Sequence, residues 1–203
     1  MRLYSYIVIV DSGFAPNPFG KYCTLACCKP KIRATAQKDD WIVGLSKKAH
    51  GNKLIYVMKV TEPPLTFTDY YQDERFQDKK PDTENSDLRF RRGDNIYEPY
   101  GDEFKQLSSA HSNKDGSENP DTKQHDLGSK NVLVSSHFYY FGTDMIDLPE
   151  NLNFLIVGRA HRCRFTDEQI EAFLAFIKQQ KRGIHAPPND WKDTDNSWRS
   201  KCR

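Results

Sequence analysis

The residues of this chain best suited to catalysis are its cysteines, its histidines and one early aspartate. Asp11 opens a twenty-residue segment, residues 11–30, in which Cys27 and Cys28 are adjacent, and His137 lies in a later apolar stretch. A cysteine activated by a histidine, which an acid in turn orients, is a common enzymatic nucleophile. Both cysteines precede a predicted short helix, whose dipole favours the thiolate. If the chain is an enzyme, we predict Asp11, Cys27 and His137 as its catalytic residues.

A zinc site is the second chemistry that these residues suggest. Cys23, Cys27 and Cys28 with one histidine would offer the thiolate and imidazole ligands that zinc prefers. The spacing disagrees, because C-x3-C-C lacks the usual C-x2-C pair and Cys163 and Cys202 stand alone. We therefore predict no metal and no cofactor, and expect the cysteines to act as small apolar side chains. The histidines considered as ligands are His111, His125, His137 and His161.

Recognition of a base without catalysis is the third possibility. Aromatic rings can stack on a flipped or free base while polar side chains read its edge. The predicted base-binding residues are Phe14, Asn17, Phe19, Trp41, Tyr139 and Tyr140, and the predicted phosphate contacts are Arg159, His161 and Arg164. Because side chains alternate along a strand, Tyr139 and Tyr140 point to opposite faces, and only one of them is expected to line a pocket.

The segment 11–30 needs a rigid support if it is to form one wall of a site. The apolar run 3–10 precedes it and predicts a buried strand. The last helix has the clearest signal, because Thr166 and Gln169 form a capping box ahead of an apolar stripe that ends before Gly183. The other predicted elements are a helix at about 31–37, a hairpin of 41–45 and 54–60, a helix capped by Thr66, and strands at 132–142 and 154–165.

Residues 77–131 lack apolar periodicity, and charged and turn residues dominate them. Such a composition predicts a long loop inserted over the site rather than a layer of the core. Four rings in residues 89–104 favour a functional loop, because a merely solvated loop has no use for exposed aromatics. These rings are Phe90, Tyr97, Tyr100 and Phe104.

Composition limits the remaining possibilities. The 203 residues suffice for one core, and the formal net charge of +2 argues against a long duplex footprint held by phosphates alone. Five cysteines, an odd number, fit a reduced compartment better than a disulfide framework. No apolar run approaches the roughly 20 residues of a membrane span. We therefore expect a cytoplasmic protein without a membrane partner.

Several separate motifs resemble one known family. DSGFAPNPFGKYCTLACCKPKIR, DWIVGLS, RRGDNIYEP, HSNKDGSENP, SSHFYYFG and VGRAHRCRF together resemble the type-two nucleotide modification associated domain. This resemblance spans nearly the whole chain and implies a place in the systems by which phages and bacteria modify DNA bases. The order of elements is also similar to the PUA-like fold of EVE and YTH domains, which bind modified bases.

These observations predict a single α+β domain over residues 1–188, followed by a polar tail at 189–203. The expected fold is a PUA-like twisted β-barrel or curved mixed sheet, flanked by two or three helices. The expected function is binding of a modified base, nucleotide or nucleic acid in an aromatic pocket. Two alternatives stay open: an enzyme acting on a nucleobase or its precursor through cysteine, histidine and aspartate, and an adaptor for other DNA-modification proteins.

Overall fold

The computed structural model describes residues 1–191 of the chain, which divide into two compact units. Unit 1 consists of Met1–Asp11, Lys38–Thr61 and the described chain from Ser135, and unit 2 consists of Ser12–Gln37 and Glu62–Val134. Cys202 and most of the predicted polar tail lie outside the described residues. The single domain over residues 1–188 stays a prediction.

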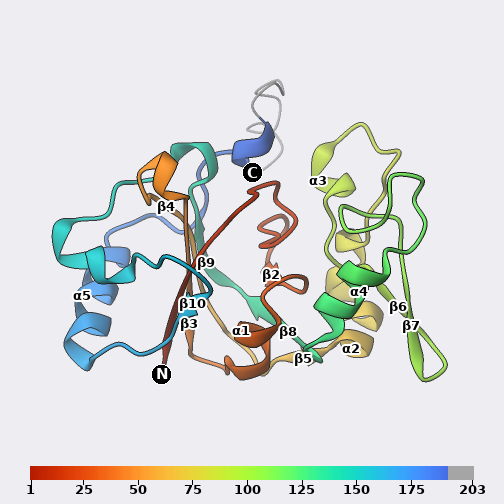
Figure 1. Ribbon diagram of the computed structural model, residues 1–203, viewed down its shortest axis with the longest axis horizontal. Helices are drawn as coiled ribbons and strands as arrows, with labels where there is room; N and C mark the ends of the chain where they lie inside the picture. Colours follow the sequence, from red (N-terminus) through yellow and green to blue (C-terminus); the bar gives the residue numbers. More distant parts are fainter. Residues whose placement is uncertain (192–203) are drawn as a thin grey trace. The chain divides into compact units, whose positions relative to one another are not determined.

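Unit 1 contains a mixed six-stranded sheet with the order β10-β1-β3-β4-β9-β11 (Figure 1). β1 runs parallel to β3 and β11 runs parallel to β9, whereas the other neighbours are antiparallel. The bounds are β1 Leu3–Ile7, β3 Trp41–Leu45, β4 Leu54–Lys59, β9 His137–Tyr140, β10 His161–Arg162 and β11 Gly183–Ile184. The mixed sheet confirms the α+β class. Of the two predicted forms, the β-barrel is wrong, because β10 and β11, of two residues each, end the mixed sheet at opposite edges. The PUA-like assignment stays a prediction.

Helix α5, Asp167–Ile177, covers the unit 1 sheet (Figure 1). Its predicted capping box is confirmed, because the Thr166 hydroxyl accepts from the Gln169 N–H and the Gln169 side chain accepts from the Thr166 N–H. The stripe of Ile170, Phe173 and Ile177 packs in the same buried cluster as Trp41. Each such side chain contributes roughly 1.5–3 kcal/mol by leaving water.

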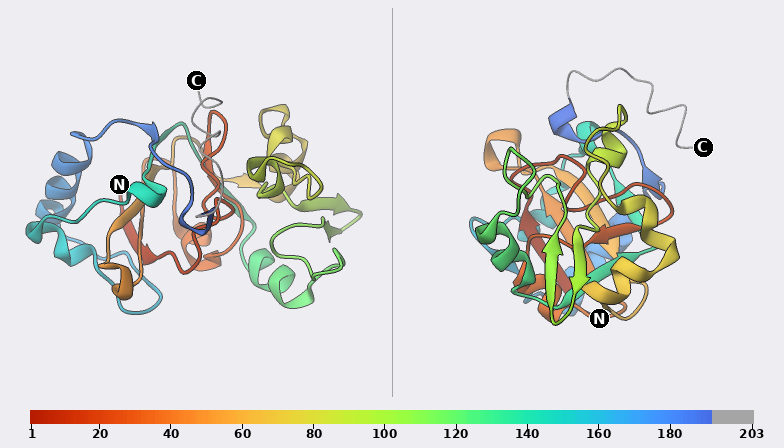
Figure 2. Two further views of the ribbon diagram at one scale, coloured as in Figure 1. Left: turned by 90° about the horizontal axis from the view of Figure 1, so that it is seen from above. Right: turned by 90° about the vertical axis from the view of Figure 1, so that its right-hand side faces the viewer.

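Unit 2 is built from small sheets and short helices. One sheet has the order β2-β8-β5, and β6 and β7 form a separate antiparallel hairpin (Figure 2). The strands are β2 Cys23–Leu25, β5 Leu65–Thr66, β6 Tyr97–Tyr100, β7 Glu103–Gln106 and β8 Asn131–Ser135. The helices are α1 Pro30–Thr35, α2 Phe67–Gln72, α3 Leu88–Arg91 and α4 Pro120–Leu127. The predicted cap of α2 is confirmed, because Thr66 and Asp69 form a capping box.

The segment 77–131 is not the predicted structureless loop. It contains α3, β6, β7 and α4, and its Ile96 and Tyr97 belong to the buried core of unit 2. Apolar periodicity in the sequence cannot reveal these elements. The strands β6 and β7 have four residues each, and α4, PDTKQHDL, has a single leucine. Of the four rings expected to be exposed, Phe90 and Tyr100 are 40% and 76% exposed, whereas Tyr97 is buried.

Two other stretches differ from the predicted strands. The 154–165 stretch begins in a 3-10 helix, η4, and contributes only the two residues of β10 to the sheet. The first strand stops at Ile7, and Ile9 and Val10 are exposed.

The 3-10 helices are η1 Lys48–His50, η2 Glu74–Lys79, η3 Gly142–Asp144, η4 Glu150–Leu155 and η5 Asn189–Trp191. No helix among the described residues is long and apolar enough to cross a membrane.

Candidate functional site

Cys28 lies in unit 2 at a sharp turn between β2 and α1. Cys28 and Lys29 both have left-handed backbone angles, with φ of 58° and 43°, which non-glycine residues rarely adopt. Two charged side chains fix the turn: Asp126 Oδ1 accepts from the Cys28 N–H at 2.6 Å, and Arg33 Nε donates to the Cys28 carbonyl at 2.7 Å. The turn presents the half-buried Cys28 side chain in a defined place.

Arg33 connects three parts of unit 2. The side chain is fully buried on α1, and its guanidinium also donates to the carbonyls of Asp126, at the end of α4, and Asn131, at the start of β8. Burial lowers the pKa of Arg33, while the nearby Cys27 and Asp126 oppose this effect. Because a guanidinium stays charged in a protein, Arg33 places a fixed positive charge beside the turn.

His111 contacts Cys28 through one ring nitrogen and Asp126 through the other. Its Nε2 lies 3.6 Å from Cys28 Sγ, and its Nδ1 lies 2.6 Å from Asp126 Oδ2. The imidazole packs against the Phe14 ring with 4.6 Å between centroids, and the Thr122 hydroxyl donates to the His111 carbonyl. Burial alone would lower the pKa of His111, but its bonds to Asp126 and Cys28 raise that pKa to about 10.

Asp126 is the most heavily bonded member of this group. Its carboxylate is fully buried and accepts from the Cys28 N–H, from the Tyr97 hydroxyl at 2.9 Å and from His111. Burial favours the neutral acid, yet these bonds, with that to His111 foremost, keep the pKa of Asp126 below its usual value. We call Cys28, His111 and Asp126 the thiol centre.

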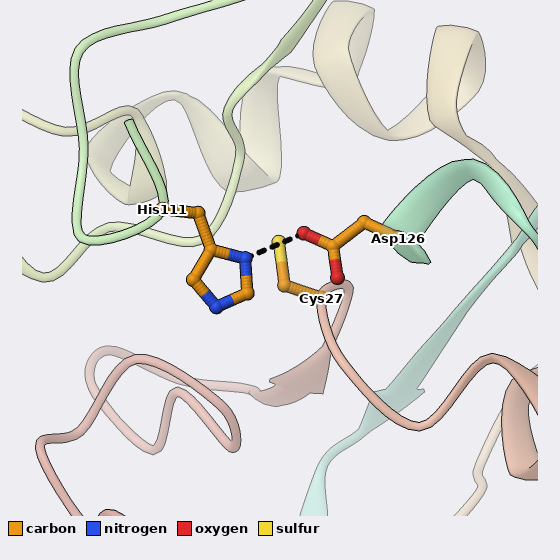
Figure 3. A group of neighbouring side chains, drawn as sticks. All are labelled: Cys27, His111 and Asp126. Carbon is orange, nitrogen blue, oxygen red and sulfur yellow. Dashed lines mark hydrogen bonds and ion pairs between the residues drawn. The ribbon is translucent and has the colours of Figure 1, made fainter. Parts of the chain in front are cut away.

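Cys27 lies beside the thiol centre without belonging to its hydrogen-bond chain. Its Sγ, a ring nitrogen of His111 and a carboxylate oxygen of Asp126 all lie within 4.8 Å of one another, and Figure 3 shows the sulfur directed at the His111–Asp126 pair. Burial raises the pKa of Cys27, and the nearby Asp126 and Asp94 raise it further. The expected activation of Cys27 by the helix dipole is therefore wrong in direction.

Cys27, His111 and Asp126 offer a thiol, an imidazole and a carboxylate, which are the three side-chain types that bind zinc in proteins. The prediction of no metal rested on the spacing of the cysteines. The ligand atoms found here come from β2–α1, from the loop after β7 and from α4, so the absence of a C-x2-C pair excludes nothing.

The other two predicted catalytic residues, Asp11 and His137, belong to unit 1. The Asp11 carboxylate is buried and accepts from the Tyr140 hydroxyl, the Asn189 N–H and the Asn189 side-chain amide. Burial raises the pKa of Asp11, and these hydrogen bonds partly oppose the rise. Asp11 thus holds η5 in place within unit 1. Its convergence with Cys27 and His137 stays a prediction.

His137 is surrounded by aromatic side chains and cations. Its ring packs edge-on against Trp41, and its Nε2 lies 3.2 Å from the Tyr139 hydroxyl. Burial lowers the pKa of His137, and the positive charges of Arg182 and Lys59 lower it further. His137 is therefore a neutral imidazole near neutral pH.

Most predicted base-binding residues are enclosed within their own unit. Phe14, Trp41, Tyr139 and Tyr140 are 3%, 5%, 2% and 0% exposed, and Asn17 is 1% exposed, with its Oδ1 accepting from Lys79 Nζ. Stacking of a base on these rings would require them to leave their packed positions, and it stays a prediction. Phe19 differs, because it lines a pocket of about 480 Å³ in unit 2 together with Tyr22 and Arg75. Of the predicted phosphate contacts, Arg159 and Arg164 are exposed and His161 is partly buried.

Sequence reasoning missed Asp126 and considered His111 only as a metal ligand. Asp126 lies on a polar helix whose pattern resembles a solvated surface, although the residue itself is buried. No sequence signal marks Asp126, because the left-handed turn at Cys28 and Lys29 that it anchors is visible only in the structure.

Comparison with curated proteins and with solved structures gives no match. The family model described as nucleotide modification associated domain 2 matches residues 1–195. This match confirms the resemblance drawn from the motifs and supports a role associated with nucleotide modification. The chain belongs to the nucleotide modification associated domain 2 family.

Proposed function

We propose that this chain is an acyl-transfer enzyme of nucleotide modification that uses Cys28 as its nucleophile. The observation that carries the proposal is the order of contacts in the thiol centre. Cys28 Sγ meets one nitrogen of His111 and the buried Asp126 carboxylate meets the other. This order is that of nucleophile, base and orienting acid in cysteine and serine acyl-transfer enzymes.

Each member of the thiol centre has a defined part in the proposed reaction. Because the pKa of His111 is about 10, its ring already holds the proton at neutral pH, and Cys28 attacks as the thiolate paired with this imidazolium, forming a bond to the carbonyl carbon of an ester, thioester or amide. Asp126 holds the Nδ1 side of the ring and stabilises the imidazolium. His111 then gives its proton to the leaving group as the old bond breaks, which leaves a thioester on Cys28. An amine, a hydroxyl or water accepts the acyl group and restores the thiol.

A nucleotide is the expected substrate because the description of the family names nucleotide modification. We propose that the acyl group is carried to or from a nucleotide or one of its modified bases. The half-buried position of Cys28 allows a substrate to reach the sulfur, whereas Cys27 is 0% exposed. The proposal therefore assigns the nucleophile to Cys28 instead of Cys27.

The test uses p-nitrophenyl acetate as a simple acyl donor. We expect a burst of nitrophenolate and an acetyl group on Cys28, located by fragment ions of the peptide that also contains Cys23 and Cys27. Cys28→Ser should abolish the burst. Cys163→Ser is the matched control, because Cys163 is an exposed free cysteine in unit 1. Acetylation of Cys28 at the rate of an ordinary exposed thiol would contradict the proposal.

A second candidate function is the recognition of a modified base without catalysis. The observation that favours it is the pocket of about 480 Å³, which lies within the size range of small-molecule sites. Phe19 and Tyr22 provide aromatic surface there, and Lys21 provides an exposed cation. Fluorescence titration with ordinary and modified nucleotides tests it: Phe19→Ala should weaken binding by about 1–3 kcal/mol if a base stacks on the ring. Equal binding by the variant would remove Phe19 from the site.

A further inference from the structure

Cys27 is a buried thiol beside the thiol centre, and the proposed acyl transfer does not use it. Within the part of the chain that the structure describes, its Sγ has one weak hydrogen-bond partner, the Asp94 carbonyl at 3.6 Å. The sulfur nevertheless lies within 4.8 Å of both His111 and Asp126. Cys27 therefore belongs to the buried core of unit 2 and also brings a third metal-ligating group beside an imidazole and a carboxylate.

We propose that Cys27, His111 and Asp126 form a binding site for a thiophilic divalent cation of the zinc type, and that occupation of this site switches off Cys28. The part that concerns Cys28 rests on the proposed acyl-transfer function. The cation site itself stands on the placement of the three ligand atoms.

The geometry requires only a small contraction. Zinc bonds of about 2.0–2.3 Å in a tetrahedron place neighbouring ligand atoms roughly 3.3–3.8 Å apart. Cys27 Sγ, the His111 ring nitrogen and the Asp126 carboxylate oxygen lie within 4.8 Å of one another. Side-chain movements of about 1 Å would therefore bring them to bonding distance from one cation. His111 Nδ1 and Asp126 Oδ2, which are 2.6 Å apart, would instead move apart as the cation replaces the proton between them.

Charge and surroundings also fit a cation. The thiolate of Cys27 and the carboxylate of Asp126 would supply two negative charges. The Tyr97 hydroxyl and the Cys28 N–H already hold Asp126 from the second layer, an arrangement typical of ligating carboxylates. Cys28 Sγ faces Nε2, on the other side of the His111 ring, and is not one of the ligands. Arg33 opposes the cation, but its guanidinium is committed to backbone carbonyls.

The consequence for Cys28 follows from the shared residues. A cation bonded to His111 and Asp126 removes the imidazolium that pairs with the Cys28 thiolate and the acid that orients this ring. The same residues therefore cannot serve both purposes at once. We infer reversible inhibition of the thiol centre by zinc.

The first experiment measures zinc binding to the full chain by competition with a chromophoric chelator. We expect one zinc per chain, with Cys163→Ser equal to the unchanged protein and Cys27→Ala at least about tenfold weaker. No zinc binding, or equal affinity in Cys27→Ala, would overturn the cation site. Cobalt provides a second measurement on the unchanged protein, should Cys27→Ala fail to fold. A thiolate-to-cobalt charge-transfer band is expected, and its absence would also overturn the site.

The second experiment follows acetylation of Cys28 with and without zinc. We expect zinc to stop the acetylation in step with its binding, and a chelator to restore it. Full acetylation at saturating zinc would overturn the switch. The two proposals can fail separately: zinc binding without acetylation in zinc-free protein removes the acyl-transfer function alone, and acetylation without zinc binding removes the cation site alone.

Discussion

His111 in unit 2 and His137 in unit 1 are both partly buried and both contact an aromatic ring, but they differ in charge. Each packs against an aromatic ring, Phe14 for His111 and Trp41 for His137. Burial lowers the pKa of both. His111 faces a buried carboxylate and its pKa rises to about 10, whereas His137 faces Arg182 and Lys59 and its pKa falls further. The partner, rather than the degree of burial, decides which histidine can hold a proton at neutral pH.

The same contrast separates the two buried aspartates. Asp126 accepts from a histidine that can become cationic, and its pKa is lowered. Within residues 1–191, Asp11 accepts from the neutral donors of Tyr140 and Asn189, and its pKa is raised. An ionised acid beside a cationic imidazole is suited to catalysis. An acid bonded to a tyrosine and an asparagine is suited to holding a segment in place. Unit 2 therefore provides the better site, although the sequence suggested residues from both units.

Replacing each aspartate by asparagine should give the largest difference between the units. Asp126→Asn should slow acetylation of Cys28 by about 10⁴-fold, because it removes the acid that orients His111. Asp11→Asn should leave acetylation unchanged and lower the thermal stability of unit 1, since an amide opposes the donors that now face a carboxylate. Burst kinetics and thermal unfolding of both variants check this. Equal loss of acetylation in both variants would contradict the assignment of Asp126 to catalysis and of Asp11 to structure.

The next effect concerns the histidines themselves. His111→Gln should slow Cys28 acetylation by about 10²–10⁴-fold, the usual contribution of a positioned base. His137→Gln is the matched control and should acetylate at the unchanged rate, because its pKa leaves it neutral and it contacts Tyr139 and Trp41. Rates measured under identical conditions for the two variants decide the point. A slow His137→Gln with a fast His111→Gln would restore the catalytic assignment made from the sequence.

The two histidines also predict opposite dependences of stability on pH. Folded His111 keeps its proton up to about pH 10, whereas the unfolded chain loses it near 6.5, so stability should fall as pH rises through this window. The loss is on the order of 1.4 kcal/mol per pKa unit. Folded His137 binds its proton less readily than the unfolded chain, so its contribution falls as pH drops below 6.5.

Thermal unfolding across this pH range tests both statements. His111→Gln should flatten the alkaline fall and His137→Gln should flatten the acid fall. An alkaline fall that survives in His111→Gln would have to come from other groups, and the assigned ion pair with Asp126 would then be wrong.

The sequence predicted those parts of the molecule that have local signals. The hairpin of β3 and β4 was found from β-rich runs around Gly51 and Asn52, and α2 and α5 from their capping residues. The thiol centre has no local signal. Cys28 is 83 residues from His111 and 98 from Asp126, and α4 has no apolar stripe to show which face is buried. Pairing at such separation depends on tertiary packing, which residue spacing does not encode.

The smallest expected effects come from the two capping boxes, one in each unit. Thr66→Ala and Thr166→Ala should each cost about 1 kcal/mol of stability, the usual value of an N-cap. The Thr66 box should cost slightly more, because Thr66→Ala also removes the bond that the Thr66 hydroxyl donates to Asp69 Oδ2 at 2.7 Å. Denaturant unfolding of the two variants measures the difference. Neither cap touches the thiol centre, so both variants should acetylate Cys28 normally, and a slow Thr66→Ala would mean that α2 helps to hold the centre within unit 2.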